Sequence, residues 1–535
     1  EFLVGSLGCS MPGTDATHDS PGGIVGVEDS TSTVSSPMVA PASPSSPAAT
    51  TMVERAATSP SPSPSPSPSP SPAPSPTPPS PAPSPATGAW GAPQLIEADA
   101  APVVAGQRLV VAPNGKAVSV WLQERTNGNQ TLYSVHARAY SPESGWGAAT
   151  AYNLTGQDDA SQPQVAINSS GDAIVVWVQN GATPGILRDY NIASVRYSAA
   201  AGSWDAAPAY LLGVNEIPQA ISVGMDTHSI TLDDAGNSFY AIANGTIFDA
   251  PDGAWVKQYR NGTWTEATRF LPGASTEGKD LSLAATPSGN AATAIWKQYD
   301  NTGNKYRVLA SEYREGSGWT VGHEIDGNLA ESYGPARIAI AANGDTMAVW
   351  EASTSGGSRT DLYASRLANG AWSQPAIVGG DPLGRAGYLA GLCSDASGNT
   401  MMVTLPTFDL GQVAATRFSV TSGWGTAERM PPADQNLIVP QASVGCNTRG
   451  DAMVSYRAMM AADDSYQLWA RPYVAGTGWG NAAPIVSLPA GGQLALAGPV
   501  SGLDDSFRSV TVWRQDQQPA IALDKPQDLW SATFQ

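Results

Sequence analysis

The chain has 535 residues, and Asp plus Glu outnumber Lys plus Arg 46 to 27, for a formal net charge of −19. Such a surface repels phosphate groups, which excludes a nucleic-acid-binding protein and predicts a soluble, exported or surface protein. No run of 18 apolar residues occurs, which excludes a transmembrane helix in the sequence given.

The first nine residues, EFLVGSLGC, read as the tail of an apolar signal segment. Ser6-Leu7-Gly8-Cys9 resembles the bacterial lipoprotein box, which implies that Cys9 is lipidated. A lipid on Cys9 would then be the only contact of this protein with a membrane. The alternative is a chance cysteine without a function.

Residues 10–86 are mostly Ser, Pro, Thr, Ala and Gly, with no aromatic side chain. We expect this segment to be a disordered linker, because it cannot bury enough apolar surface to offset its ordering entropy. Its Ser-Pro run, residues 59–85, favours polyproline II and would span roughly 80 Å. This predicts a stalk that carries a folded domain of residues 87–535. The alternatives are an inert linker and a Pro-rich ligand for another domain.

A tryptophan returns every 52 to 60 residues in the predicted folded domain, mostly within a Gly-Trp or Gly-x-Trp turn. A fixed period of this length is typical of a repeat architecture. The eight tryptophans are Trp90, Trp146, Trp204, Trp264, Trp319, Trp372, Trp424 and Trp479.

One repeat, residues 146–197, predicts four short strands, a polar loop over Thr155–Ser161 and a tight hairpin at Ser169–Asp172. The predicted strand Ala173–Trp177 is almost continuously apolar, which predicts burial of both its faces. The predicted strands are Trp146–Leu154, Pro163–Asn168, Ala173–Trp177 and Ile192–Tyr197.

Four strands are too few for a core of their own, so neighbouring repeats must stack. Eight such repeats predict an all-β fold, a closed eight-bladed β-propeller of four-stranded antiparallel blades. Residues 529–534 match residues 468–473 one repeat earlier, so Trp90–Leu95 is expected to pair with the C-terminal strand and complete the last blade. The alternative architecture is an open β-solenoid.

The tryptophan turn resembles a degenerate Asp-box, the turn of sialidase-type (BNR) propellers. The copies read Ser144-Gly145-Trp146, Asn261-Gly262-Thr263-Trp264 and Asn369-Gly370-Ala371-Trp372, without the leading Ser-x-Asp of the box. Sialidases also use three arginines, a Tyr/Glu pair and an early Arg-Ile-Pro motif, and this sequence has no Arg-Ile-Pro. The resemblance therefore implies the propeller fold and not sialidase chemistry.

The repeated tryptophans are interpreted as packing residues between blades rather than as sugar-stacking platforms. The histidines have no metal-ligand spacing and are interpreted as isolated residues; they are His18, His136, His228 and His323. No motif of a hydrolytic triad, a metalloprotease or a P-loop is present, so no catalytic residue is assigned.

Cys393 and Cys446 fall five and four residues before the equivalent turn glycines Gly398 and Gly450. This opposite parity points the two side chains to opposite faces of neighbouring blades. Because neighbouring blades meet by opposite faces, a disulfide between them is feasible. Two free buried thiols are the alternative.

The loops that link each outer strand to the next blade carry acidic residues in phase with the repeat. These acids predict a ring of carboxylates at one mouth of the central channel, which could hold Ca²⁺ or attract a basic partner. The alternative is a set of solvated loops. The acids are Glu97, Asp99, Asp158, Asp159, Glu216, Glu277, Asp280, Glu331, Asp381 and Asp434, and the candidate ligand-binding set is Asp158, Asp159, Glu216, Glu277, Asp280, Glu331 and Asp381.

The sequence thus favours a secreted or surface-tethered propeller with a non-enzymatic binding or structural role, for a glycan or a protein ligand at the cell surface. The alternative is a secreted carbohydrate-active enzyme, a glycoside hydrolase or lyase, on the same scaffold. The expected location is extracellular or at the cell surface.

Overall fold

The chain divides into two units, residues 1–78 and 79–535, and the computed structural model describes residues of the second unit only. The predicted segments 1–9 and 10–86, with the lipidation site Cys9, lie outside the described residues. The described residues are 88–97, 101–127, 130–152, 159–180, 190–211, 228–244, 253–272, 276–327, 334–353, 360–378, 387–406, 413–431, 441–459, 466–487, 498–516 and 527–535.

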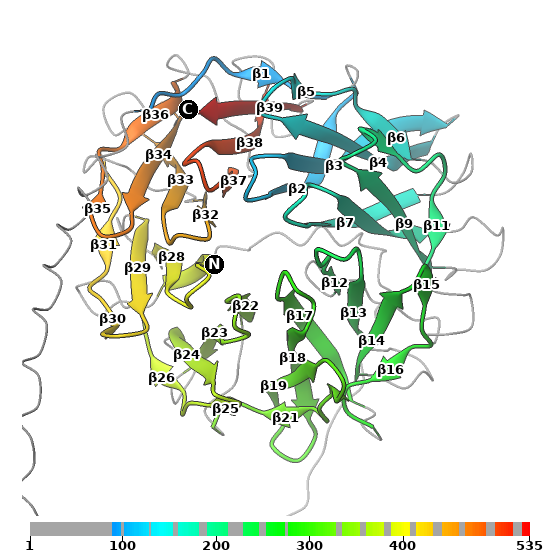
Figure 1. Ribbon diagram of the computed structural model, residues 1–535, viewed down its shortest axis with the longest axis vertical. Helices are drawn as coiled ribbons and strands as arrows, with labels where there is room; N and C mark the ends of the chain where they lie inside the picture. Colours follow the sequence, from blue (N-terminus) through cyan, green and yellow to red (C-terminus); the bar gives the residue numbers. More distant parts are fainter. Residues whose placement is uncertain are drawn as a thin grey trace, which may run out of the picture. The chain divides into compact units, whose positions relative to one another are not determined.

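Eight antiparallel sheets are arranged around a central axis, so the predicted all-β eight-bladed propeller is confirmed (Figure 1). No described residue belongs to a helix that could span a membrane. Blade 1 holds β2–β6, each later blade takes the next five strands, and blade 8 consists of β37–β39 and β1. The innermost strands are β2 (Val103–Val111), β7 (Asp159–Ile167), β12 (His228–Ile230), β17 (Gly278–Ala285), β22 (Arg337–Ile340), β27 (Gly387–Ser394), β32 (Gln441–Cys446) and β37 (Val500–Leu503).

The second strand of each blade is its most deeply buried element. In β8, residues 173–178 are all at most 1% exposed, as the apolar run predicted. The second strands are β3 (Ala117–Asn127), β8 (Ala173–Asn180), β13 (Ser238–Asn244), β18 (Ala291–Asp300), β23 (Thr346–Ser353), β28 (Thr400–Pro406), β33 (Ala452–Met459) and β38 (Ser509–Asp516). The third strands are β4 (Gln130–Ser141), β9 (Tyr190–Ser198), β14 (Gly253–Arg260), β19 (Lys305–Arg314), β24 (Thr360–Ala368), β29 (Ala414–Ser419), β34 (Tyr466–Val474) and β39 (Gln527–Phe534).

The fourth, outer strand of blades 1–7 is interrupted, so that two short segments pair with the same third strand. The segments at the tryptophan turns are β5 (Gly145–Trp146), β10 (Ser203–Trp204), β15 (Thr263–Trp264), β20 (Gly318–Trp319), β25 (Ala371–Trp372), β30 (Gly423–Trp424) and β35 (Gly478–Trp479). The second segments are β6 (Thr150–Tyr152), β11 (Ala209–Tyr210), β16 (Thr268–Arg269), β21 (His323–Glu324), β26 (Ala376–Ile377), β31 (Glu428–Arg429) and β36 (Ala483–Ser487), and blade 8 has β1 (Gln94–Leu95).

Two details of the predicted repeat were wrong. The expected continuous strand from Trp146 is split into β5 and β6, and the ladder is lost after the amide of Gly147 bonds to Ala139. The innermost strand begins at Asp159, within the expected polar loop, because a β-bulge at Gln162 (φ 53°) lets the strand continue before Pro163.

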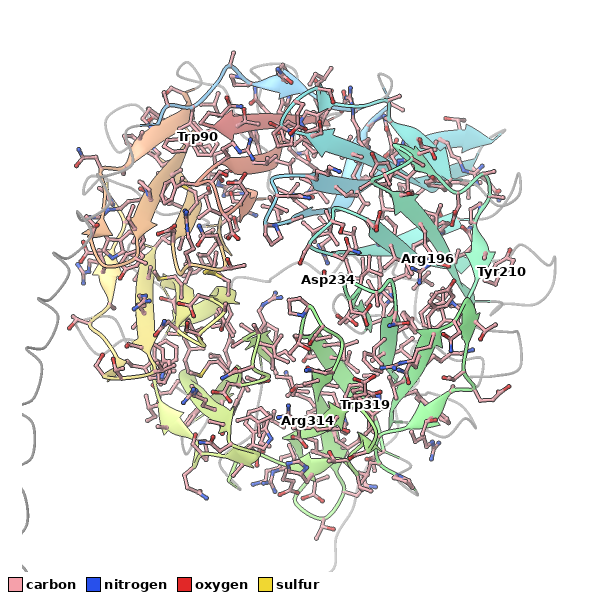
Figure 2. The ribbon with its side chains drawn as sticks, in the orientation of Figure 1. Trp90, Arg196, Tyr210, Asp234, Arg314 and Trp319 are labelled. Carbon is pink, nitrogen blue, oxygen red and sulfur yellow. A yellow bond between two sulfur atoms is a disulfide. The ribbon has the colours of Figure 1, made fainter. Side chains whose placement is uncertain are left out.

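The first and last described strands of the folded unit close the ring, as predicted. Gln94 and Leu95 pair with Ser531 and Trp530, and an isolated bridge joins Trp90 to Phe534, whose rings lie 5.5 Å apart (Figure 2 labels Trp90). Blade 8 therefore takes its outer strand from the start of the domain and its other three strands from the end, which removes an exposed edge.

The hairpins between innermost and second strands bond to one another around the ring. In blade 2, Gly171 has φ 91°, and the Asn168 side chain accepts hydrogen bonds from the amides of the turn. The amide of Ser169 also donates to the Asp234 carboxylate of blade 3 at 2.9 Å, and the Asn168 amide group donates to the carbonyl of Asp233 (Figure 2 labels Asp234). These bonds fix the angle between neighbouring blades.

The core lies between the faces of adjacent blades. One cluster packs Ile295 and Val308 of blade 4 against Trp350 and Tyr363 of blade 5. The tryptophans of the second strands are fully buried, and four of them donate their indole N–H to a glutamine two residues later. These pairs are Trp121–Gln123, Trp177–Gln179, Trp296–Gln298 and Trp513–Gln515.

The eight turn tryptophans are packing residues, as interpreted, but all of them are only half-buried. Seven pack against an aromatic residue of the third strand in tilted or edge-to-face contacts, at centroid distances between 5.0 and 5.6 Å. The pairs are Tyr140–Trp146, Tyr197–Trp204, Tyr259–Trp264, Tyr313–Trp319, Phe418–Trp424, Tyr473–Trp479 and Phe534–Trp90.

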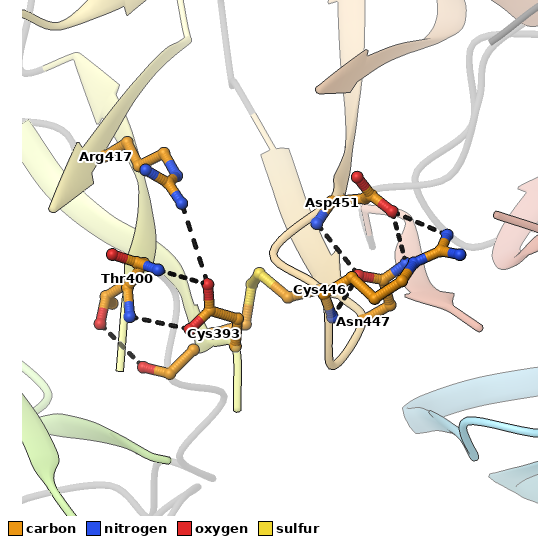
Figure 3. The surroundings of a disulfide bond; sticks show 10 residues. Cys393, Thr400, Arg417, Cys446, Asn447 and Asp451 are labelled. Atoms are coloured by element: carbon orange, nitrogen blue, oxygen red, sulfur yellow. Dashed lines mark hydrogen bonds and ion pairs between the residues drawn. A yellow bond between two sulfur atoms is a disulfide. The ribbon is translucent and has the colours of Figure 1, made fainter. Parts of the chain in front are cut away.

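A disulfide joins Cys393 in blade 6 to Cys446 in blade 7, with an Sγ–Sγ distance of 2.04 Å and a Cα–Cα distance of 5.7 Å (Figure 3). The two half-buried cysteines lie on innermost strands, β27 and β32, which face each other across the blade boundary. The bond thus links two blades near the central axis.

Candidate functional site

Of the ten acids expected to form a carboxylate ring, the structure describes four. Glu97 is nearly buried and accepts a hydrogen bond from the amide of Leu529 at 2.8 Å, so it contributes to ring closure. Asp159, Glu277 and Asp280 belong to the candidate ligand-binding set and are discussed below. The acids outside the described residues are Asp99, Asp158, Glu216, Glu331, Asp381 and Asp434.

Asp159 begins the innermost strand of blade 2, and its carboxylate accepts a hydrogen bond from the backbone amide of Tyr133 in blade 1 at 2.7 Å. Burial raises the pKa of Asp159, although this amide opposes the rise. The side chain therefore connects two blades through a half-buried carboxylate.

Glu277 and Asp280 lie together at the start of the innermost strand of blade 4. Asp280 has φ 52°, and its Oδ2 lies 2.5 Å from Nζ of the fully buried Lys297. Burial lowers the pKa of Lys297, while Asp280 favours its charged form. The charge of Asp280 is thus neutralised by a lysine of the neighbouring strand.

Glu277 is exposed and accepts a hydrogen bond from the hydroxyl of Tyr306. Burial raises the pKa of Tyr306, and Glu277 raises it further. The Tyr306 ring lies 3.4 Å from Nζ of Lys279 and 5.1 Å from the ring of Tyr299, in an edge-to-face contact. The described acids of blade 4 therefore have protein partners.

Within the described ranges, no group of three or more His, Cys, Asp or Glu side chains is arranged to hold a metal ion. His136 lies 3.0 Å from the Ser134 hydroxyl, and His228 lies 2.8 Å from the carbonyl of Gln162, in different blades. Because six of the ten acids lie outside these ranges, calcium binding stays a prediction. A calcium-dependent rise in melting temperature that is reduced by Asp158→Ala with Asp159→Ala would support it.

A groove of about 1010 Å³ runs along the outer strands of blades 1 and 2. The groove begins at the tryptophan turns, which connect the third strand of a blade to its outer strand. The predicted acidic loops connect the outer strand to the next blade. In an antiparallel blade, consecutive connections lie at alternate ends of the strands. The groove therefore begins at the end opposite the predicted acidic loops, and no residue of the candidate ligand-binding set lines it. The lining includes Lys116, Glu143, Thr150, Tyr152, Tyr197, Ser203, Trp204 and Asp205.

Aromatic rings form one wall of this groove. The half-buried Trp204 packs on Tyr197 with centroids 5.0 Å apart. Tyr152 is 5% exposed, and its ring lies 6.1 Å from Trp204 and 5.9 Å from Trp177. The wall therefore joins the outer edge of blade 1 to the turn tryptophan of blade 2.

Polar groups form the rim of the groove. The exposed carboxylate of Asp205 accepts a hydrogen bond from the backbone amide of Arg196 through Oδ2, at 3.0 Å. Ser203, Glu143 and Thr150 also reach the groove surface. The groove thus combines an aromatic wall with several hydrogen-bonding groups, which is typical of small-molecule sites.

Tyr152 departs from the repeat. Tyr152 pairs with Val135 of the third strand. In six other blades, the outer-strand residue whose backbone amide bonds to the equivalent third-strand residue is apolar and buried. The Tyr152 hydroxyl, in contrast, is buried and has no hydrogen-bond partner among the described residues. Burial raises the pKa of Tyr152, and the Asp205 carboxylate raises it further. The six apolar equivalents are Ile96, Leu211, Phe270, Ile325, Val378 and Met430.

The chain matches no protein-family model and no curated protein. Among solved structures, it is similar to the BP39L lectin from Burkholderia pseudomallei, with 12% identity, 72% of this chain and 100% of the lectin covered, and a TM-score of 0.43. It is also similar to the polysaccharide lyase Uly1, with 9% identity, 80% of this chain and 89% of the lyase covered, and a TM-score of 0.43. The intramolecular trans-sialidase from Ruminococcus gnavus has 9% identity, with 79% of this chain and 93% of the trans-sialidase covered, and a TM-score of 0.34. The loose resemblance to sialidase-type propellers is confirmed for the fold alone. These similarities carry no argument about the ligand or the activity.

Proposed function

We propose that the propeller is a non-enzymatic glycan-binding domain, and that a short saccharide binds in the groove between blades 1 and 2. The observation that supports this proposal is the aromatic wall of Trp204 and Tyr152 beside the hydrogen-bonding rim around Asp205. The C–H face of a sugar ring packs on an aromatic ring, while its hydroxyl groups need donors and acceptors at the edge. A volume of about 1010 Å³ suits an oligosaccharide rather than the larger, flatter contact of a folded protein.

The carboxylates of the groove favour binding over hydrolysis. A glycosidase needs one carboxylic acid that is still protonated near neutral pH, which requires a raised pKa. Hydrogen bonds, chiefly from a backbone amide, instead lower the pKa of the exposed Glu143, so it stays ionised. Asp205, the other carboxylate of the groove, is exposed to solvent as well.

A glycan array with the full chain tests the proposal, followed by calorimetric titration of the best saccharides. Trp204→Ala should abolish measurable binding, because it removes the stacking surface. Trp424→Ala is the matched control: Trp424 occupies the same turn in blade 6 and packs on Phe418 at 5.4 Å, so it should lower stability without lowering affinity. Equal affinity loss in both variants, or no saccharide bound by the folded chain, would refute the groove as the site.

The enzyme alternative has its own readout. The full chain is incubated with the bound saccharides and with generic polysaccharides, and the products are analysed by mass spectrometry. Release of shorter products that is lost on Asp205→Asn would assign catalysis to this groove and overturn the binding role. Intact saccharides after long incubation would support it.

We also propose that the protein functions outside the cytoplasm. The disulfide between Cys393 and Cys446 supports this location, because disulfides persist in oxidising compartments. Alkylation and mass spectrometry of the protein from its native source would find the bond intact if the proposal holds. Two alkylated free thiols would contradict it.

A further inference from the structure

The Tyr152 hydroxyl has a cost that the other blades avoid. A hydroxyl buried without a hydrogen-bond partner destabilises a folded protein, and native structures contain few such groups. The six equivalent residues avoid this cost because they are apolar. A ligand that bonds to the hydroxyl would remove the cost on binding, and Tyr152 lines the groove where the ligand is proposed to sit.

Asp205 lines the same groove as Tyr152 and supplies a complementary group. Its Oδ2 is occupied by the amide of Arg196, whereas no described residue is seen to donate to its Oδ1. The backbone bond fixes the carboxylate, so that Oδ1 can accept without further ordering. A phenol donor next to a carboxylate acceptor matches a sugar hydroxyl, which both donates and accepts.

The charge of the groove decides which sugars fit. Its lining carries the carboxylates of Asp205 and Glu143 but one ammonium group, that of Lys116. The whole chain has a net charge of −19, which adds a repulsive field for anions. Lys116 and Arg508 offset the charge of Glu143, which leaves the Asp205 carboxylate and the net charge of the chain. A uronic acid, a sulfated sugar or a sialic acid would therefore be repelled, whereas an uncharged sugar would not.

We infer that the groove selects uncharged saccharides, and that the Tyr152 hydroxyl with the Asp205 carboxylate recognises one sugar hydroxyl. This inference rests on the proposed glycan-binding function. Tyr152 and Asp205 are here specificity-determining residues, and Trp204 provides the stacking surface. The Tyr152 hydroxyl is covered in the structure, so a small shift of the rings around it accompanies binding.

The test compares matched pairs of oligosaccharides, one neutral and one carrying uronate or sulfate groups, by calorimetric titration with the full chain. Only the neutral member should bind, with an affinity that changes little between low and high salt. Tyr152→Phe should weaken binding about five- to tenfold, as expected for one lost hydrogen bond, and Asp205→Ala should weaken it by at least as much. Tyr473→Phe, the control in blade 7, should bind like the unmodified chain.

The possible failures can be told apart. Preferential, salt-sensitive binding of the acidic members would overturn the inference while leaving the glycan-binding proposal intact. The same holds if neutral saccharides bind but Tyr152→Phe has no effect on affinity. If Trp204→Ala removes no binding, or if neither member of any pair binds, the proposed function fails and this inference fails with it.

Discussion

Replacing Tyr152 by Phe should stabilise the propeller, in the direction opposite to its effect on binding. The substitution removes only the hydroxyl, and the ring keeps its packing against Trp177 and Trp204 at 5.9 and 6.1 Å. Most substitutions of a buried residue destabilise, because they create a cavity or leave a partner unpaired. Neither applies here, since the hydroxyl has no partner among the described residues.

The magnitude follows from the cost of an unsatisfied buried polar group, about 1–3 kcal/mol. For a domain of about 450 residues, the unfolding entropy of roughly 2.1 cal/mol/K per residue amounts to about 0.9 kcal/mol/K. A stabilisation of about 1–3 kcal/mol therefore raises the melting temperature by about 1–3 °C. Because the raised pKa of Tyr152 keeps its hydroxyl protonated near neutral pH, the gain should not depend on pH there.

Differential scanning calorimetry of the full chain, without ligand, measures this change. Tyr473→Phe serves as the control, because Tyr473 is half-buried at a third-strand end, packs on Trp479, and is not among the described side chains with a buried group that lacks a partner. It should leave the melting temperature within a few tenths of a degree. A melting temperature of Tyr152→Phe equal to or below that of the unmodified chain would show that the hydroxyl is satisfied in the free protein. The hydroxyl would then need no ligand, and its proposed role in binding would be refuted.

Three further predictions concern the scaffold. Replacing Cys393 and Cys446 by Ser should lower the free energy of unfolding by up to roughly 4 kcal/mol, which is the value of the chain-entropy model for a separation of 53 residues. The melting temperature should then fall by about 4 °C. An unchanged melting temperature would mean that the disulfide does not constrain the unfolded chain. Trp90→Ala should speed hydrogen exchange in β39 and leave β19 unchanged, because only β39 pairs with the start of the domain, and equal protection would contradict closure by these strands. Gln179→Leu should cost about 1–3 kcal/mol by leaving the indole N–H of Trp177 unpaired, and adding Trp177→Phe should restore part of it. A double variant as unstable as the sum of both single variants would contradict the pairing.

The fold could be predicted from the sequence because its signals are local and repeated. Each blade carries the same turn, from Gly145-Trp146 onward. The last repeat has only three strands of its own, so Trp90–Leu95 was expected to provide its outer strand. The interruption of the outer strands and the bulge at Gln162 could not be predicted in the same way. Both depend on how the ladder hydrogen bonds are shared between strands, which the apolar pattern does not encode.

The site was harder to predict than the fold. In-phase acids suggested a carboxylate ring, yet the structure gives Asp159 a backbone amide of the preceding blade and Asp280 a buried lysine. The groove instead arises where the outer edges of two blades meet, between residues about 50 positions apart. One signal was available in the sequence, the tyrosine at position 152, where the aligned residues of other repeats are aliphatic, methionine or phenylalanine.

In a repeat protein, the other blades provide an internal reference for each position, and a departure from it has two different meanings. Lys297 follows a buried tryptophan; blades 1 and 2 carry an apolar residue there, and blades 5 and 8 carry Glu351 and Arg514. Asp280 neutralises Lys297 at 2.5 Å, and a charge that is compensated within the protein in this way needs no ligand. Tyr152 also introduces a polar group at an apolar position, but no described residue compensates it, and a groove lies beside it. The uncompensated departure at Tyr152 points to a ligand, because it lies beside a groove where binding can supply the missing hydrogen bond.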